Sequence, residues 1–400
     1  MSRRANEAVL YLSYDGLLEP LGQSQVVAYL EPLASQHPIH IVSFEKQADR
    51  ADDDRMAAMR ARLSAAGIGW TPLAYHKSPT VPATAYDIAH GALVATGLAL
   101  RLHASIVHAR SYVAALMALA VKRATGAKLL FDMRGFWPDE RVDGGLWPKG
   151  GALYRGAKTL EGVLIRNADH IVTLTHASAR EMQRWAAYDA RKPPTTVIPT
   201  CADLRLFRPQ DPPAATPFVF GYVGSVGTWY LFDETLDLFR VLSRRRPDAR
   251  MLVVNRRDHE AIHAAAARAG VEGGRLEIVA AEHAEVPRHL SRMHAAASII
   301  KPAYSKIASA PTKLAEYLGC GVPCVGNAGV GDVEEILEGR RVGLALRRFD
   351  DAEYEAAADR LFALLADPGV RNRCVGTAAE LFSLTAGARD YGAIYAREAL

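Results

Sequence analysis

The sequence predicts an α/β protein built from two doubly wound domains in tandem. The chain has 400 residues, which is long for one hydrophobic core, so two domains of about 200 residues each are expected. Apolar runs of strand length alternate with helical patterns, and this alternation is typical of parallel sheets covered by helices. A proline-rich stretch near the middle of the chain interrupts the alternation, which then starts again.

The first half of the chain predicts a buried parallel sheet. Short apolar runs without polar alternation are typical of strands that are covered on both faces. Such runs predict strands at Ala8–Ser13, Ile39–Phe44, Ser105–His108, Lys128–Asp132 and His170–Thr173. Apolar residues at helical spacing predict helices at Gln25–Gln36, Tyr112–Arg123 and Ala152–Asn167.

The second half predicts another sheet of the same kind. Strands are expected at Phe218–Val223, Arg250–Val254, Leu276–Val279 and Ser298–Lys301, with helices at Leu231–Arg245 and His259–Ala269. The stretch Lys192–Pro217 is the expected linker. We therefore expect a first domain over residues 1–200 and a second over 201–385. A last helix over about 386–400 carries an apolar stripe that needs a partner surface, for which the first domain is a candidate.

The composition excludes several classes of protein. Hydrophobic residues make up 50% of the chain and charged residues 23%, as in ordinary globular proteins, and a net charge of +4 does not indicate nucleic-acid binding. No apolar run is long enough to span a membrane, and the first residues lack the pattern of a signal peptide. The four cysteines form no CxxC pair, so buried free thiols in a reducing cytoplasm are expected.

The most informative segment is Ser309–Val325, SAPTKLAEYLGCGVPCV. It predicts a helix that ends at glycines, and the start of a helix gathers unpaired N–H groups and the positive end of the helix dipole. Such a start suits a phosphate, to which Ser309, Thr312 and Lys313 add donors and a positive charge. Glu316, one turn further on, can accept hydrogen bonds from sugar hydroxyls.

Loops at the ends of two other strands of the second half add candidates for the same site. Gly224 and Ser225 follow the strand that ends at Val223, and they can present backbone N–H groups to a diphosphate. Asn255 and Arg256 follow the next strand and belong to the same edge of the sheet. A solvated arginine is the alternative for Arg256.

Two loops at strand ends in the first half are further candidates. Gly22 and Gln23 can bring backbone and side-chain donors to a ligand, with an ordinary connecting loop as the alternative. Asp132 and Arg134 follow a strand, where a carboxylate can act as acid or base and a guanidinium can hold a phosphate. The acceptor-side candidates further along this loop, with packing in a surface loop as the alternative, are Trp137, Asp139 and Glu140.

Four motifs resemble the family 4 retaining glycosyltransferases, which have the GT-B fold. Ala168–Met182 (ADHIVTLTHASAREM) and VIPTCADLRLFRP resemble a helix entry and the interdomain hinge of that family. FGYVGSVGTWY resembles the first strand and loop of the donor domain, and KLAEYLGCGVPCV resembles its helix–glycine–strand motif. The resemblance implies two Rossmann-like domains facing across a cleft, with the acceptor on the first and a nucleotide-sugar donor on the second.

The resemblance also assigns roles to single residues. Glu316 matches the second glutamate of the family's E-x7-E motif, whereas Ala308 stands where the first glutamate is expected. Arg134 aligns with the acceptor-side histidine of the family. The loop after the first donor-domain strand has neither arginine nor lysine, so Lys313 and Arg256 are expected to neutralise the diphosphate. These departures indicate a divergent branch.

The implied reaction is transfer of a hexose-type sugar from a nucleoside diphosphate to a hydroxyl with retention of configuration. Asp132, Arg134 and Lys313 are the expected catalytic residues, and no metal or other cofactor is expected. The expected partners are a nucleotide-sugar donor and a glycan or lipid-linked acceptor, as in bacterial surface polysaccharide or glycolipid synthesis. A cytoplasmic protein is expected, with peripheral contact at the inner face of the cell membrane left open. The alternatives are an epimerase or phosphorylase of the same fold and a catalytically silent nucleotide- or glycan-binding protein.

Overall fold

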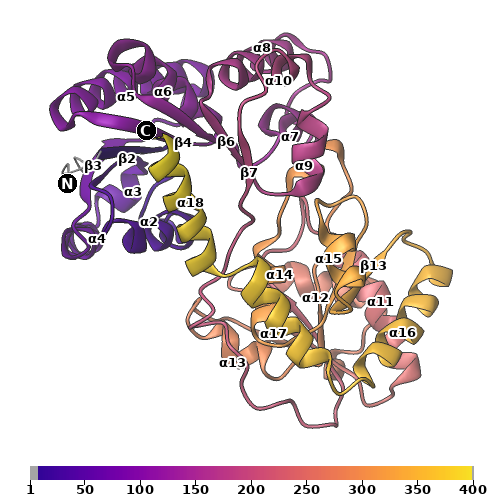
Figure 1. Ribbon diagram of the computed structural model, residues 1–400. Coiled ribbons are helices and arrows are strands. Elements are labelled where there is room, and N and C mark those ends of the chain that lie inside the picture. The colour runs from indigo at the N-terminus through magenta and orange to yellow at the C-terminus, as the bar shows by residue number, and fades with distance from the viewer. Residues whose placement is uncertain (1–7, 399–400) are drawn as a thin grey trace. The chain divides into compact units, whose positions relative to one another are not determined.

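Two parallel sheets, each covered by helices on both faces, make up the computed structural model, which describes residues 8–398 (Figure 1). Unit 1 contains the chain up to Val142, Trp147–Pro199 and the chain from Leu384 onward. Unit 2 contains Asp143–Leu146 and Thr200–Ser383. The prediction of two Rossmann-like, doubly wound domains is confirmed by these two sheets.

The sheet of unit 1 has seven parallel strands in the order β3-β2-β1-β4-β5-β6-β7. The strands are β1 (Ala8–Ser13), β2 (Ile39–Glu45), β3 (Gly69–Ala74), β4 (Ala104–Arg110), β5 (Lys128–Asp132), β6 (His170–Thr173) and β7 (Thr195–Val197). β1, β4 and β5 lie in the middle of the sheet and are buried along most of their length. Their continuous apolar runs follow from this double-sided burial.

Helices cover both faces of this sheet. The helices are α1 (Pro20–Gly22), the π-helix η1 (Gln23–Val27), α2 (Ala28–Leu33), α3 (Gln47–Arg50), α4 (Asp53–Ala65), α5 (Thr80–Leu102), α6 (Ser111–Thr125), α7 (Trp137–Asp143), α8 (Ala152–Asn167), α9 (His176–Met182), α10 (Ala186–Asp189) and α18 (Leu384–Glu398). α5 packs against α6, and α6 against α8, on one face of the sheet, whereas α18 packs against α2 on the other (Figure 1).

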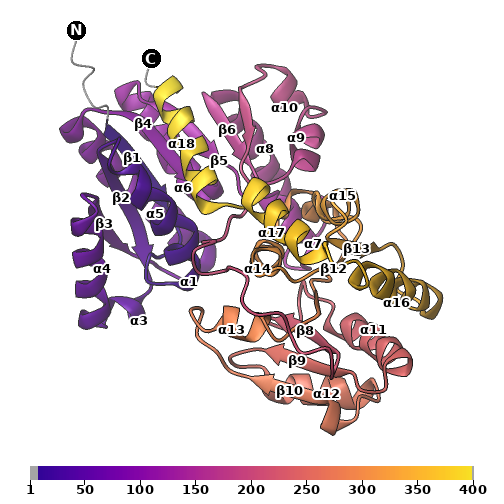
Figure 2. The same cartoon turned by 60° about the horizontal axis from the view of Figure 1, so that its bottom comes forward.

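The last helix belongs to unit 1, although the whole of α11 to α17 lies between it and the last strand of the sheet on which it packs. Its buried residues Leu384, Ala388, Tyr391 and Tyr395 recur at intervals of three, four and seven positions, which forms one apolar stripe. Figure 2 shows α18 (yellow) lying across the strands of unit 1. The tyrosines of the stripe reach β4 and β5, where they make hydrogen bonds to His108 and Asp132.

The sheet of unit 2 has six parallel strands in the order β10-β9-β8-β11-β12-β13. The strands are β8 (Val219–Val223), β9 (Arg250–Val254), β10 (Leu276–Val279), β11 (Ala295–Ala297), β12 (Cys324–Asn327) and β13 (Gly343–Leu346). The helices are α11 (Phe232–Arg245), α12 (His259–Arg268), η2 (Gly273–Arg275), α13 (Val286–Leu290), η3 (Tyr304–Ala308), α14 (Thr312–Gly319), α15 (Val333–Gly339), α16 (Asp351–Leu365) and α17 (Val370–Leu381).

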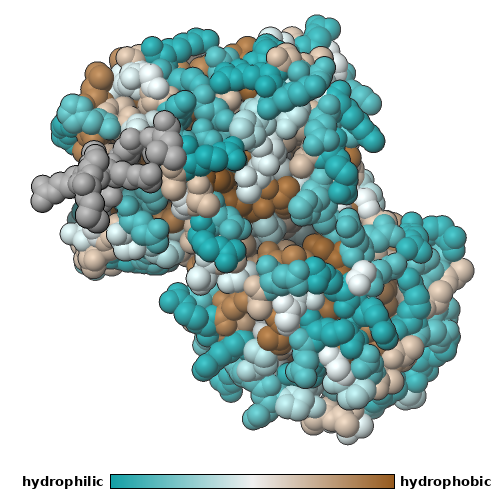
Figure 3. Space-filling view, viewed as in Figure 1, coloured by the Kyte–Doolittle hydropathy of each residue, from teal (hydrophilic) through white to brown (hydrophobic). Residues whose placement is uncertain are grey.

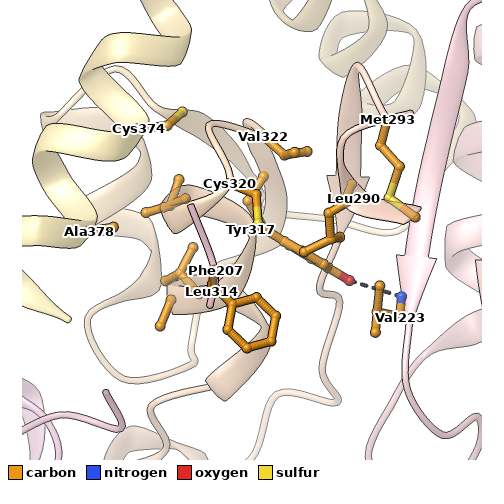
Figure 4. Close-up of a cluster of buried hydrophobic side chains, with 14 of the residues drawn as sticks. Phe207, Val223, Leu290, Met293, Leu314, Tyr317, Cys320, Val322, Cys374 and Ala378 are labelled. Carbon is orange, nitrogen blue, oxygen red and sulfur yellow. Dashed lines mark hydrogen bonds between the residues drawn. The ribbon is translucent and has the colours of Figure 1, made fainter. Parts of the chain in front are cut away.

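Hydrophobic clusters fill both faces of the unit 2 sheet. One cluster joins α14 and α17 to the sheet and includes Phe207, Leu314 and Tyr317 (Figure 4). The other joins α11 and α16 to the opposite face. Hydrophilic residues cover most of the surface that Figure 3 turns to the viewer. All four cysteines are buried and free, as predicted from their spacing.

The structure differs from the predicted elements at identifiable places. The strand predicted at Ser298–Lys301 is wrong, because β11 is formed by Ala295–Ala297, whose alanines have low strand propensity but are fully buried. The first helical segment begins at Pro20 rather than Gln25. The patterns do not predict β3, which is half-buried and contains Pro72, or α5, in which apolar residues occur on every side.

Candidate functional site

Tyr317 fixes the helix that carries the candidate phosphate-binding residues. Its hydroxyl donates to the carbonyl of Ala297 at 3.2 Å and accepts from the backbone N–H of Val223 at 3.0 Å (Figure 4). These two bonds join α14 to the carboxyl ends of β8 and β11. Lys313 lies one turn before Tyr317 on the same face of the helix, so it is held beside the loop that follows β8.

Gly224 and Lys313 come into contact at this edge, as the sequence predicts for one site. Gly224 has a φ of +105°, in the region that favours glycine. A Cβ atom at this position would lie 2.9 Å from Cε and 3.3 Å from Nζ of Lys313. The side chain of Lys313 therefore fits beside the loop after β8 because residue 224 has no side chain.

The ammonium group of Lys313 is buried without a hydrogen bond. The residue is 7% exposed, and Nζ has no hydrogen-bond partner among the described residues. The contacts of Nζ are with aromatic rings, 4.1 Å from the ring centre of Tyr222 and 3.6 Å from that of Tyr230. Burial lowers the pKa of Lys313 to about 7, and the nearby Glu316 opposes this shift. A cation that is so costly to bury indicates a site completed by an anion.

Glu316 lies one turn from Lys313 and is buried as well. Burial raises the pKa of its carboxyl to about 7, against the opposing charge of Lys313. The first turn of α14 has no side-chain cap, because Pro311 stands at the N-cap position. Thr312 is the first residue of this helix, Ser309 precedes it by three positions, and both are half-buried. This edge thus combines a cation, an acceptor and a helix start.

The side chains of the loop after β9 mainly stabilise the neighbouring loop and leave few groups available to a ligand. The amide of Asn255 donates to the carbonyl of Gly224 at 2.9 Å and to Asp258, and its oxygen accepts two backbone N–H bonds. All its hydrogen-bonding groups are therefore used, and the side chain supports the Gly224 loop instead of offering a group to a ligand. Arg256 is more than half exposed and paired with Glu282 at 2.6 Å, which favours the solvated alternative. Ser225 is exposed, and its carbonyl accepts from Tyr222.

A second polar cluster lies at the carboxyl edge of the unit 1 sheet and contains both predicted residues of that loop. Asp132 ends β5, is 1% exposed and accepts a hydrogen bond from Tyr391 at 3.0 Å. Nη1 of Arg134 lies 3.9 Å from this carboxylate, and Nη2 donates to Gln25 at 3.4 Å. Although burial alone would raise it, the charge of Arg134 holds the pKa of Asp132 below its usual value.

The backbone of Arg134 is strained. Its φ is +59°, in the left-handed region that a long side chain seldom adopts, at a cost of about 1–3 kcal/mol. Neighbouring Gly135 also has a positive φ. Such strain is characteristic of functional loops, and here it turns the guanidinium toward Asp132 and Gln25.

Two members of this cluster, His108 and Arg110, are not among the residues predicted from the sequence. His108 Nδ1 lies 2.7 Å from the hydroxyl of Tyr395, and Nε2 lies 3.7 Å from Asp132. Burial lowers the pKa of His108. Arg110 is 4% exposed and lies 3.5 Å from Asp15. The signal was available, because VHAR places two titratable side chains at the end of a buried strand.

Three buried polar atoms in this cluster have no hydrogen-bond partner among the described residues. They are Nε2 of His108, Nε of Arg110 and Oδ1 of Asp132. Buried polar atoms are rarely left unsatisfied, so their concentration in one place indicates room for a polar ligand or water. The cluster is thus the best candidate for a polar site in unit 1.

The remaining predicted residues of unit 1 have structural contacts. A Cβ atom on Gly22 would lie 2.1 Å from the carbonyl oxygen of Gly16, and Gln23 donates to the carbonyl of Leu18. Both residues therefore stabilise the connecting loop. This structural role is the alternative to ligand binding that the sequence left open.

The acceptor-side candidates lie on α7. Trp137 packs between Tyr112 and Trp147, and Asp139 accepts from Tyr154 at 2.8 Å and from Lys158 at 3.0 Å. These contacts favour the packing alternative for Trp137 and Asp139, and Glu140 is half-buried. Among the residues that the structure describes, no three histidine, cysteine or acidic side chains gather to hold a metal ion.

Comparisons with known proteins agree with this architecture. Residues 23–201 match the sequence profile of the glycosyl transferase 4-like domain. The sequence matches no curated protein. A search of solved structures finds sucrose-phosphate synthase from Thermosynechococcus elongatus, with a TM-score of 0.71, 14% identity and 98% of each chain covered. A glycosyltransferase from Rickettsia africae has a TM-score of 0.70 and 14% identity, over 98% of this chain and 99% of that chain.

A third similar structure is HepE from Anabaena in complex with UDP and glucose. Its TM-score is 0.66 at 13% identity, over 98% of this chain and 99% of that chain. At such low identity the structural likeness shows the fold alone. The chain therefore has the GT-B fold, and residues 23–201 are similar to the glycosyl transferase 4-like domain.

Proposed function

We propose that this protein transfers a sugar from a nucleoside-diphosphate sugar to an acceptor hydroxyl with retention of configuration. The observation that carries the proposal is the buried, unpaired ammonium of Lys313 between Tyr222 and Tyr230. A diphosphate placed beside Gly224 and the start of α14 would give this cation its missing hydrogen bonds. The match to a glycosyl transferase 4-like domain supports the same class of reaction.

Unit 2 is the proposed donor side. Lys313 and the N–H groups at the start of α14 would stabilise the negative charge that develops on the leaving diphosphate. Glu316 would accept a hydrogen bond from a hydroxyl of the donor, and its raised pKa keeps a proton available near neutral pH. UDP and UDP-glucose are the first donors to test, because HepE was solved with each of them.

Unit 1 is the proposed acceptor side. Nε2 of His108, Nε of Arg110 and Oδ1 of Asp132 make no hydrogen bond among the described residues, so they can hydrogen-bond a hydroxyl-rich acceptor. Asp132 is poorly suited to act as a covalent nucleophile, because Tyr391 donates to its Oδ2 and Arg134 faces the carboxylate. We therefore propose that the leaving phosphate, rather than a carboxylate, takes the acceptor proton. A role in bacterial surface polysaccharide or glycolipid synthesis is part of this proposal.

Nucleotide release from a panel of donors tests the proposed reaction. Purified protein is incubated with UDP-, GDP- and dTDP-sugars and a lipid-linked acceptor, with and without EDTA. We expect release of nucleoside diphosphate with at least one donor, unchanged by EDTA, and a product whose anomeric configuration equals that of the donor. Binding of donors and acceptors without release would contradict the proposal in favour of a silent binding protein. Epimerisation of the donor without transfer would identify an epimerase.

A further inference from the structure

Three helices on one face of unit 1 have an unusual charge composition. α5, α6 and α8 lie side by side on the sheet (Figure 1). They contain two acidic residues, Asp87 and Glu161, which are 0% and 2% exposed. Asp87 accepts from Tyr14 and from the backbone of His76, and Glu161 accepts from Tyr112. The outer face of these helices therefore presents no acidic side chain to solvent.

Arginines are present on the same face, and they are unpaired. The exposed arginines of the three helices are Arg101, Arg123, Arg155 and Arg166. None of them makes an ion pair with another described residue, although exposed arginines elsewhere in this protein commonly do. On α10, which packs against α8, the exposed acid Asp189 is paired with Lys192.

Large hydrophobic side chains are exposed on two of the same helices. Nine such side chains are exposed in the part of the chain that the structure describes, and six of the nine belong to α5 and α8. The six are Val81, Tyr86, Leu93, Leu100, Leu153 and Leu160. On α5 the intervening exposed positions are small residues such as Ala85, Ala89 and Gly97. Exposed apolar residues that gather on one face mark an interaction surface.

The outer helices of unit 2 show that this composition is not required by the fold. There α11 and α16 cover one face of a similar sheet, and their exposed arginines are paired with acids. Arg240 pairs with Asp351 at 3.1 Å, and Arg244 pairs with Glu355 at 2.6 Å. A helix layer that faces water in this protein thus carries both signs of charge.

We propose that the outer face of α5, α6 and α8 lies on an anionic lipid bilayer. The exposed arginines complement lipid phosphates, and the leucines and Tyr86 would enter the boundary between head groups and acyl chains. None of the described helices is long and apolar enough to cross a membrane, so this face rests on the bilayer and does not span it. A second copy of the chain fits less well, because a twofold contact would bring arginines together without acids to pair them.

Vesicle sedimentation tests this surface. The full-length protein is mixed with vesicles of phosphatidylcholine alone or of phosphatidylcholine and phosphatidylglycerol in equal parts, without nucleotide. We expect the protein to sediment with the anionic vesicles only, and less so at high salt, because salt screens the arginines. Leu93→Glu with Leu100→Glu, and Arg155→Glu with Arg166→Glu, should each lower the fraction bound at least tenfold.

The control variants change the same charge elsewhere. Arg389→Glu on α18 and Arg205→Glu in unit 2 are highly exposed and lie off the face, so they should bind vesicles like the wild type. Unchanged melting temperatures show that each variant folds. Wild-type protein that stays in the supernatant with anionic vesicles would overturn the proposal, as would equal binding by the face variants. A wild-type dimer that the Leu93→Glu variant dissociates would instead identify a second copy as the occupant.

Vesicle binding and sugar transfer can be tested independently of each other. Vesicle binding is measured without a donor, so it does not depend on catalysis. The face variants should bind UDP with wild-type affinity, because their substitutions lie in unit 1 and outside the Lys313 site.

Discussion

Each unit has a polar cluster at the carboxyl edge of its sheet, and the two clusters differ in how their buried cations are paired. In unit 1, Arg134 faces Asp132, and Arg110 faces Asp15, so each buried cation has a carboxylate within 4 Å. In unit 2, Lys313 has aromatic rings around it and no hydrogen bond. The buried cations of unit 1 face carboxylates, whereas Lys313 makes no hydrogen bond and has as its acidic neighbour Glu316, whose pKa of about 7 leaves it partly protonated at neutral pH.

The pKa shifts of the two clusters separate them further. In unit 1 the pKa of Asp132 is lowered, that of His108 is lowered and that of Arg134 is raised, so all three keep one charge state around neutral pH. In unit 2 the pKa values of Lys313 and Glu316 both lie at about 7. Unit 1 therefore offers fixed charges to a neutral acceptor, whereas unit 2 can change charge when a diphosphate arrives.

Removing the carboxylate of unit 1 should have the largest effect on stability. Asp132→Ala would leave Arg134 buried without its counter-charge, which typically costs about 3–5 kcal/mol. Chemical denaturation should show this loss in unit 1. Asp15→Ala, at a half-exposed partner of Arg110, should cost far less. Equal costs for the two variants would break the view that the Asp132 pair is the buried one.

The matching change in unit 2 should have the opposite sign. Lys313→Met removes a buried cation without a partner, so we expect the free protein to be stabilised at pH 7. The folded-state pKa of about 7 lies below the ordinary lysine value of 10.5, so wild-type stability rises as pH increases from about 7 to 10.5, by at most about 1.4 kcal/mol per pH unit. The advantage of the variant should shrink across this range. Thermal denaturation at several pH values measures this difference in stability. A variant less stable than the wild type at pH 7 would contradict the view that Lys313 destabilises the free protein.

Loss of one hydrogen bond in unit 1 should cost less than loss of the carboxylate. Tyr391→Phe removes the donor to Asp132 that comes from α18, at a cost of about 1.5–3 kcal/mol for a bond to a charged group. Tyr86→Phe, at an exposed tyrosine, is the control and should leave stability unchanged. Denaturation curves that coincide for the two variants would mean that α18 is not held by this bond.

Donor affinity should depend on pH through unit 2 alone. Above pH 7 the free protein loses the Lys313 proton, and Glu316 gains a negative charge, so UDP affinity should fall by up to about tenfold per pH unit for each proton that binding requires. UDP itself is fully ionised in this range, since a terminal phosphate has a second pKa of about 6. Calorimetric titrations between pH 7 and 9 measure the slope. An affinity that is independent of pH would place the titrating pair outside the donor site.

The fold could be predicted from the sequence wherever burial left a periodic signal. Strands covered on both faces, such as Ala8–Ser13 and Arg250–Val254, gave continuous apolar runs at their true positions. β11 was not predicted because three alanines carry no strand signal. α5 was not predicted because its outer face is apolar as well. Its missing polar face is the same property that marks it as an interaction surface.

The candidate site could be predicted in part. A lysine and a glutamate one turn apart, beside a glycine loop, were enough to place Lys313, Glu316 and Gly224 together. Which polar side chains are already satisfied depends on tertiary contacts, so the sequence could not separate Lys313 from Asn255, whose amide is fully bonded. The strand-end position of His108 could be read from the sequence, but its contact with Tyr395 could not, because α18 is distant in the sequence.

The central claim is that the buried ammonium of Lys313 binds the diphosphate of the donor. The affinity of the Lys313→Met variant for UDP tests this claim most directly. Isothermal titration calorimetry at pH 7 should show about tenfold to hundredfold weaker binding than in the wild type, corresponding to ~1.5–3 kcal/mol for a charge-assisted contact. Lys128→Met removes an exposed lysine from unit 1 and should bind UDP as the wild type does. Equal affinity of the wild type and Lys313→Met would contradict the account.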